Sequence, residues 1–177
     1  GFNDPTPVDE DGGNTGTTLG EQRLNVFNRA AQLWGARLES DVPIFVGALF
    51  GPQPCSATSG VLASAGPTSV FRDAPEFPSA GTWYVGGLAD ALSGVDQDPG
   101  FIDIITRFNG DIGVNPACLT GLDWYNGYDN NNAGNEFDLL TVVMHELSHG
   151  LGFLELASEG TGALFLGFPD AYLVNMA

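Results

Sequence analysis

Apolar residues recur every three or four positions early in the chain, which is the spacing of a helix that packs one face against a core. The positions are Leu24, Phe27, Ala31, Trp34 and Leu38. Thr18 and Glu21 stand just before them in the S/T-x-x-E arrangement that satisfies the unpaired amides at a helix start. The pattern therefore predicts an amphipathic helix that begins near Thr18 and ends near Ser40 to Pro43.

Two later runs have the patterns of strands. Residues 44–50 form a short, continuously apolar run bounded by proline and glycine, which is typical of a buried strand. Residues 102–108 instead alternate between two faces. One face carries Ile102, Ile104, Thr106 and Phe108, and the other carries Asp103, Ile105 and Arg107. Because charges on a strand commonly mark the edge of a sheet, we predict an edge strand here.

Composition sets limits on the kind of protein this is. With 177 residues and 43% hydrophobic content, the chain is long enough for one domain with a substantial core. Residues 1–17 are polar and acidic and are expected to be a flexible leader, so the predicted domain spans residues 18–177. No stretch approaches 18 uninterrupted apolar residues, so no membrane span is predicted.

The chain is strongly acidic. Five Lys and Arg residues against 22 Asp and Glu residues give a net charge of -17. This charge would repel nucleic acid and anionic membrane surfaces, so neither is expected as a partner, and it favours cationic ligands and metal ions. The sequence leaves the oligomeric state open.

The two cysteines, Cys55 and Cys118, lie in stretches rich in Pro, Gly or Asn. We expect them to form a disulfide in a secreted protein, either extracellular or periplasmic. Two free thiols in a cytosolic protein are the alternative, because pairing cannot be read from a sequence.

The stretch VVMHELSHGLGFLE, residues 142–155, carries the most specific chemical signal. His145 and His149 are the chain's two histidines, and residues four apart on a helix share a face, so both imidazoles can bind one ion. Imidazole suits Zn²⁺, whose catalytic sites keep three protein ligands and a water molecule. Glu146 lies about 100 degrees around the helix from His145 and can reach that water as a general base. The apolar residues around them predict a buried helix.

HELSHGLGF resembles the zinc-binding helix of the metzincin clan of metallopeptidases, whose signature is H-E-x-x-H-x-x-G-x-x-H. The match covers His145, Glu146, His149 and Gly152, and Glu155 stands where the third histidine would be. The small snapalysin-type proteases of that clan are similar in using an aspartate there, so the resemblance implies Glu155 as the third ligand. More loosely, the chain is similar to a group of secreted bacterial proteins with HELGHGLGF-like helices.

Asp170 is the alternative third ligand. It lies 21 residues after His149, a separation close to that of the thermolysin-like gluzincins, which place a glutamate on a separate helix. Residues 123–138 are a separate candidate site for Ca²⁺, because Asp, Asn and Glu recur there at close spacing. They depart from the D-x-[DN]-x-[DN]-G loop, so a solvated loop is the competing interpretation.

The resemblance also implies a fold. It is an α+β, metzincin-like zincin lobe with a twisted mixed sheet, a long packing helix, an edge strand and a buried active-site helix. Only 22 residues follow Glu155, so the C-terminal lobe would be reduced or truncated. In such enzymes a peptide substrate pairs with the edge strand, which here implies substrate binding at Ile104, Thr106 and Phe108.

The expected function is that of a zinc-dependent endopeptidase acting on peptide or protein substrates. Glu146 would deprotonate a water molecule that zinc activates. Two alternatives stay open. The chain could be a secreted, non-catalytic binding domain that a metal stabilises, or an inactive precursor or truncated form of the enzyme.

Overall fold

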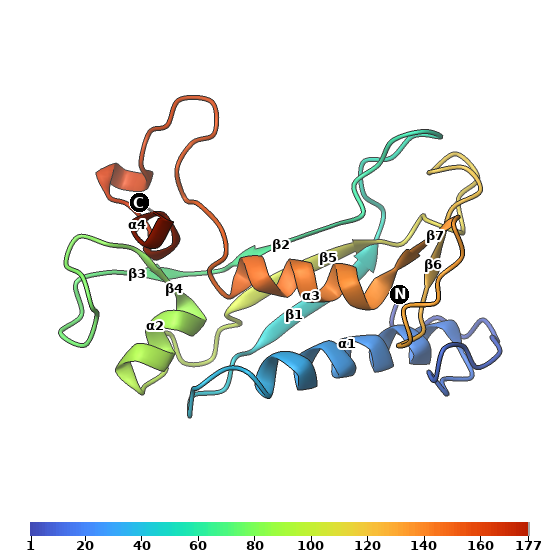
Figure 1. Cartoon of the computed structure of the whole chain (residues 1–177), viewed down its shortest axis with the longest axis horizontal. Coiled ribbons are helices and arrows are strands. Elements are labelled where there is room, and N and C mark those ends of the chain that lie inside the picture. The colour runs from blue at the N-terminus through green and yellow to red at the C-terminus, as the bar shows by residue number, and fades with distance from the viewer. Residues whose placement is uncertain (177) are drawn as a thin grey trace. The chain divides into compact units, whose positions relative to one another are not determined.

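A computed structural model describes residues 1–176, which form an α+β fold of helices and small sheets (Figure 1). The chain divides into two compact units. The first contains residues 1–38, 48–64 and 106–146, and the second contains residues 39–47, 65–105 and the chain from residue 147. Strands β1 (Val46–Gly51), β2 (Ala63–Pro67) and β5 (Ile104–Asn109) and helix α3 (Leu139–Gly150) have residues in both units. No helix of residues 1–176 is long and apolar enough to cross a membrane.

Helix α1, Leu19–Gly35, begins as predicted. The Thr18 hydroxyl accepts a hydrogen bond from the Glu21 amide, and the Glu21 carboxylate accepts one from the Thr18 amide, each over 3.2 Å. The helix ends earlier than predicted, because Gly35 is followed by exposed residues that offer no packing to continue it. The buried face also differs from the predicted one: Val26 is fully buried, whereas Leu24 is 48% exposed.

Residues 1–17, the predicted leader, make defined contacts within the first unit. Asn14 is fully buried, and its side-chain amide donates to the carbonyl oxygens of Gln22 and Asn126. The Phe2 ring lies edge-on to the rings of Phe27 and Phe50, with centroids 5.1 and 5.3 Å apart. The segment therefore contributes to the core of this unit.

A three-stranded sheet contains β1 (Val46–Gly51), β5 (Ile104–Asn109) and β2 (Ala63–Pro67), in that order. The hydrogen bonds that flank β5 run from Asp103 N to Phe45 O, from Gly110 N to Gly51 O, from Asn109 N to Leu62 O and from Thr68 N to Asp103 O. The residue numbers of hydrogen-bonded partners rise together in β5 and β1, so these strands are parallel. In β5 and β2 they run in opposite directions, so these strands are antiparallel. The sheet is therefore mixed, as predicted.

The prediction that residues 102–108 form an edge strand is wrong, because β5 is the central strand of this sheet. Ile104, Thr106 and Phe108 are at most 1% exposed, so their side chains belong to the core and do not line a substrate site. The alternation has a different cause: Ile105 and Arg107 are exposed and form the solvated face of a central strand.

The first unit also contains β6 (Asp123–Tyr125) and β7 (Glu136–Asp138), which pair in parallel. Trp124 donates from its indole nitrogen to the carbonyl oxygen of Asn109 over 3.0 Å. Cys55 and Cys118 form a disulfide in this unit, so the predicted pairing is confirmed.

The second unit contains β3 (Val70–Phe71) and β4 (Tyr84–Val85), which pair antiparallel. Helix α2, Gly86–Ser93, follows β4 directly. A hydrophobic cluster holds them together, and its buried members are Phe77, Tyr84 and Ala89. The unit ends with a 3-10 helix, η1 (Phe165–Gly167), and the short helix α4 (Ala171–Met176).

Candidate metal centre on helix α3

Helix α3, Leu139–Gly150, carries the HELSH motif. Asp138 precedes it, and its carboxylate accepts a hydrogen bond from the Thr141 amide over 2.6 Å, which caps the helix start. The buried residues recur at helical spacing and form one stripe, consisting of Leu139, Val143, Glu146, Leu147 and Gly150. The sequence pattern therefore predicted this helix correctly.

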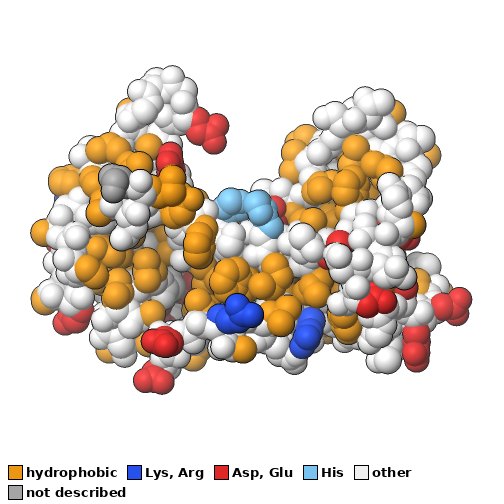
Figure 2. Space-filling model, in the orientation of Figure 1, with side chains coloured by type: hydrophobic (Ala, Val, Ile, Leu, Met, Phe, Trp, Pro, Cys, Tyr) orange, Lys and Arg blue, Asp and Glu red, His pale blue; other side chains and the backbone are white. Residues whose placement is uncertain are grey.

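His145 and His149 lie one turn apart on α3, so both side chains project from one face of the helix. His145 is exposed and His149 is half-buried. Figure 2 shows histidine side chains, in pale blue, at the molecular surface, where an ion from solution can reach them. Glu146 is 7% exposed and points around the helix away from His145.

The ring of His149 is held by a backbone contact. Its Nδ1 atom lies 2.8 Å from the carbonyl oxygen of Phe153. A carbonyl oxygen can only accept, so Nδ1 is the donor of this hydrogen bond, and in a neutral imidazole the lone pair is then on Nε2. Histidines that bind metals commonly donate their second ring nitrogen in this way, because the bond sets the tautomer and the ring orientation.

The chain turns away just after the helix at a glycine. Gly152 has φ of 110 degrees, a conformation that favours glycine. The turn is closed by hydrogen bonds from Gly152 N to His149 O (3.1 Å) and from Phe153 N to Ser148 O (3.0 Å). This turn brings the Phe153 carbonyl oxygen back to the ring of His149.

The two candidates for the third ligand have different surroundings. Asp170 is 4% exposed, and both of its carboxylate oxygens accept backbone hydrogen bonds. Oδ1 accepts from Leu173 N over 2.8 Å at the start of α4, and Oδ2 accepts from Leu156 N over 2.7 Å. Asp170 therefore has a structural role in fastening residue 156 to α4. Glu155, the residue before Leu156, is exposed.

The acidic side chains of residues 123–138, the candidate calcium loop, serve local structure. The Tyr125 hydroxyl donates to the Asp129 carboxylate, and this bond raises the pKa of the phenol and lowers the pKa of the Asp129 carboxyl. The Glu136 carboxylate accepts from the Ala133 amide over 2.7 Å. As described above, Asp138 caps α3.

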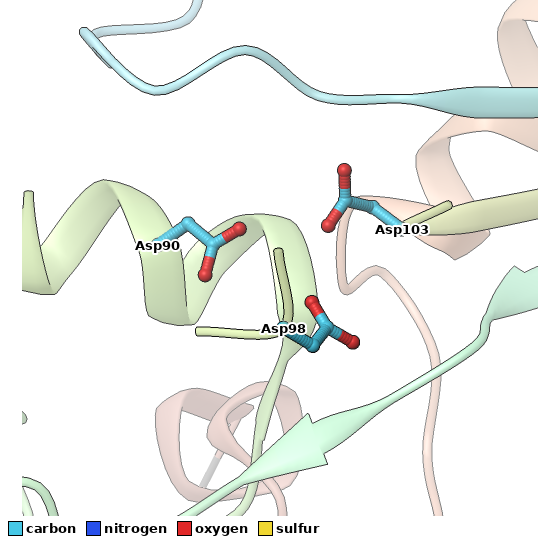
Figure 3. Close-up of side chains that lie close together, drawn as sticks. All are labelled: Asp90, Asp98 and Asp103. Atoms are coloured by element: carbon cyan, nitrogen blue, oxygen red, sulfur yellow. The ribbon is translucent and has the colours of Figure 1, made fainter. Parts of the chain in front are cut away.

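The structure also assembles a group of acids that the sequence analysis missed. Asp90, Asp98 and Asp103 lie in the second unit, with one carboxylate oxygen of each within 4.8 Å of the others (Figure 3). Burial raises the pKa of the Asp90 and Asp103 carboxyls, and the charges of neighbouring aspartates raise it further. A signal was present in the sequence, because Asp90 is an isolated charge in the apolar stretch VGGLADALSG.

Comparisons of the chain with protein-family models, with curated proteins and with solved structures gave no match in any of the three.

Proposed function

We propose that this protein is a secreted, zinc-dependent endopeptidase with a metzincin-like active-site helix. The observation that carries the proposal is the 2.8 Å contact between His149 Nδ1 and the Phe153 carbonyl oxygen. It orients the second histidine of an H-E-x-x-H helix for binding a metal through Nε2. The disulfide between Cys55 and Cys118 supports an exported protein, because disulfides persist in oxidising compartments.

In this proposal His145, His149 and Glu155 hold zinc. Glu155 is preferred over Asp170 because Asp170 already uses both oxygens to fasten backbone amides. Glu155 is exposed and lies three residues beyond the turn at Gly152.

Each residue of the motif then has a defined task. Zinc, when bound, would polarise the scissile carbonyl and acidify a water molecule. Glu146 takes a proton from the attacking water and returns it to the leaving amine. The backbone bond from His149 to the Phe153 carbonyl keeps the imidazole in one tautomer. A peptide that binds by strand addition would pair with β1 or β2, the end strands of the sheet.

The decisive experiment compares Glu146→Gln with Glu159→Gln, which removes the same charge from an exposed loop residue. Cleavage of a fluorescently labelled casein and the zinc content of each protein are measured. We expect Glu146→Gln to lower kcat/KM by about 10²- to 10⁴-fold and to retain zinc, because a general base contributes that much to such reactions. Glu159→Gln should match wild type.

Each failure of this experiment has a different meaning. Full activity of Glu146→Gln would refute the assignment of the base. A wild-type protein that binds zinc without cleaving any peptide would be a metal-stabilised binding domain or an inactive form. A wild-type protein that binds no zinc would refute the proposal as a whole.

The choice of third ligand is tested by comparing Glu155→Ala with Asp170→Ala. Glu155→Ala should lose zinc affinity while keeping the thermal stability of the zinc-free protein, because an exposed side chain contributes little to folding. Asp170→Ala should lower the thermal stability even without zinc, because two partly buried amides lose their acceptor. The reverse result would make Asp170 the ligand.

A further inference from the structure

Three aspartates converge in the second unit, away from the HELSH motif in the sequence. Asp90 lies in α2, Asp98 in the loop after it, and Asp103 directly before β5. Figure 3 shows the three carboxylates gathered around a common space, and one oxygen of each lies within 4.8 Å of the others. Asp90 is 1% exposed and Asp103 is 3% exposed, so two of the three carboxylates are almost wholly removed from water.

Backbone amides fix the orientation of the two buried carboxylates. The Gln97 amide donates to Asp90 Oδ1 over 2.9 Å, and the Phe45 amide donates to Asp103 Oδ2 over 2.7 Å. Each amide thus fixes one oxygen of its carboxylate. Within residues 1–176, no lysine, arginine or histidine forms an ion pair with any of the three aspartates.

Unpaired polar atoms at this place point to a missing ligand. Asp98 Oδ1 is completely buried, yet no hydrogen-bond donor reaches it. The Ser69 hydroxyl oxygen is also buried without a partner. It lies near Asp103, because a Cβ on Gly86 would stand 2.8 Å from Ser69 Oγ and 3.5 Å from Asp103 Oδ1. Buried polar atoms of native proteins are nearly always paired, so these orphans need a partner.

We propose that Asp90, Asp98 and Asp103 bind one Ca²⁺ ion. The proposal is independent of the zinc peptidase function. A calcium ion holds oxygen ligands at about 2.3–2.6 Å, so two ligands on opposite sides of it are about 4.8 Å apart, which is the spread of this group. Zinc is the poorer match because it favours nitrogen and sulfur, and magnesium because it demands a strict octahedron with shorter bonds.

The bound ion would stabilise the connection between α2 and β5. Residues 94–103 form this connection, and both of its glycines, Gly94 and Gly100, have positive φ. Asp98 lies within it, Asp103 is its last residue, and Asp90 lies in the preceding helix. One divalent cation would thus compensate three clustered negative charges and fasten the loop to the elements that it joins.

The test measures calcium binding by titration calorimetry on the full chain, after removal of metals with a chelator. Wild type should bind one Ca²⁺ per chain and prefer it to Mg²⁺. Asp98→Asn, which removes one ligand charge from a half-buried position, should weaken calcium binding at least about tenfold. The matched control is Asp96→Asn, two residues away with the same change of charge, and it should weaken binding less than about threefold.

Two further measurements distinguish calcium binding at the three aspartates from calcium binding elsewhere in the chain. His145→Ala should bind calcium as wild type does, and a loss of calcium binding in that variant would overturn the assignment. Calcium should also raise the melting temperature of wild type, because a ligand of the folded state stabilises it. A wild-type melting temperature that calcium leaves unchanged would refute the proposal even if Asp98→Asn fails to fold. The proposal is wrong if wild type shows no saturable calcium binding, if magnesium binds equally well, or if Asp96→Asn and Asp98→Asn lose equal affinity.

Discussion

Gly150, the last residue of α3, is the position at which the smallest change should perturb the candidate site. It follows His149 directly and is buried against the sheet. A Cβ on Gly150 would overlap Cγ2 of Ile104 and lie 2.7 Å from its Cγ1 and Cδ1. Ile104 is 1% exposed in the central strand β5, so it cannot move aside without disturbing the core.

Two opposed contributions decide whether Gly150→Ala raises or lowers the free energy of unfolding. Replacing glycine by alanine within a helix stabilises it by up to about 1 kcal/mol. Overpacking a close-packed core costs about 1–3 kcal/mol. We therefore expect a net destabilisation of about 1–2 kcal/mol. In an Ile104→Ala background the overlap is removed and the added methyl group enters the cavity, so the same substitution should become neutral or stabilising.

The assay is urea unfolding followed by tryptophan fluorescence on the four proteins of this double-mutant cycle. Gly35→Ala is the control, because Gly35 is the last residue of α1 and a Cβ there meets nothing within 4 Å. It should be neutral or stabilise the protein. Wild-type stability of Gly150→Ala, or an effect that Ile104→Ala leaves unchanged, would refute the overlap as the cause. Weaker zinc binding by Gly150→Ala would show that the overlap is transmitted to His149.

Two other predictions concern the first unit. Replacing both Cys55 and Cys118 by serine should lower the free energy of unfolding by about 4 kcal/mol in the chain-entropy account, because the disulfide closes a separation of 63 residues; equal urea midpoints for wild type and the double variant would contradict this. The hydrogen bond from Tyr125 to Asp129 should make stability depend on pH at both extremes. The pKa of Asp129 is lowered in the folded state, so its contribution is complete above the usual value of 3.8 and is lost as pH falls through the lowered value. The pKa of Tyr125 is raised, so its contribution is complete below 10 and is lost as pH rises through the raised value. Tyr125→Phe should flatten both limbs of the curve of melting temperature against pH, and an unchanged curve would argue against the bond.

Several features could be predicted from the sequence because they depend on residues close together in the chain. The capping box of Thr18 and Glu21 started α1 where the pattern placed it. The apolar stripe produced α3, and helical periodicity alone put His145 and His149 on one of its faces. The turn at Gly152 is equally local, since only glycine readily adopts its positive φ.

Other features depended on partners distant in sequence. Alternation along β5 looks the same in an edge strand and in a central strand with one solvated face, so only the pairing with β1 and β2 distinguished them. Asp170 could not be recognised as a helix cap that also holds Leu156 until both amides were in place.

The sequence by itself thus determined the helix that presents two imidazoles and an adjacent carboxylate, because helical geometry is set by the periodicity of neighbouring residues. Only the tertiary structure decided which strand is central and which acidic side chains accept hydrogen bonds from backbone amides. It also decided that the carboxylates of Asp90, Asp98 and Asp103 lie close together. The physical reason is that a carboxylate's role depends on its burial and on the charges and donors around it. These are supplied by segments that only folding brings together.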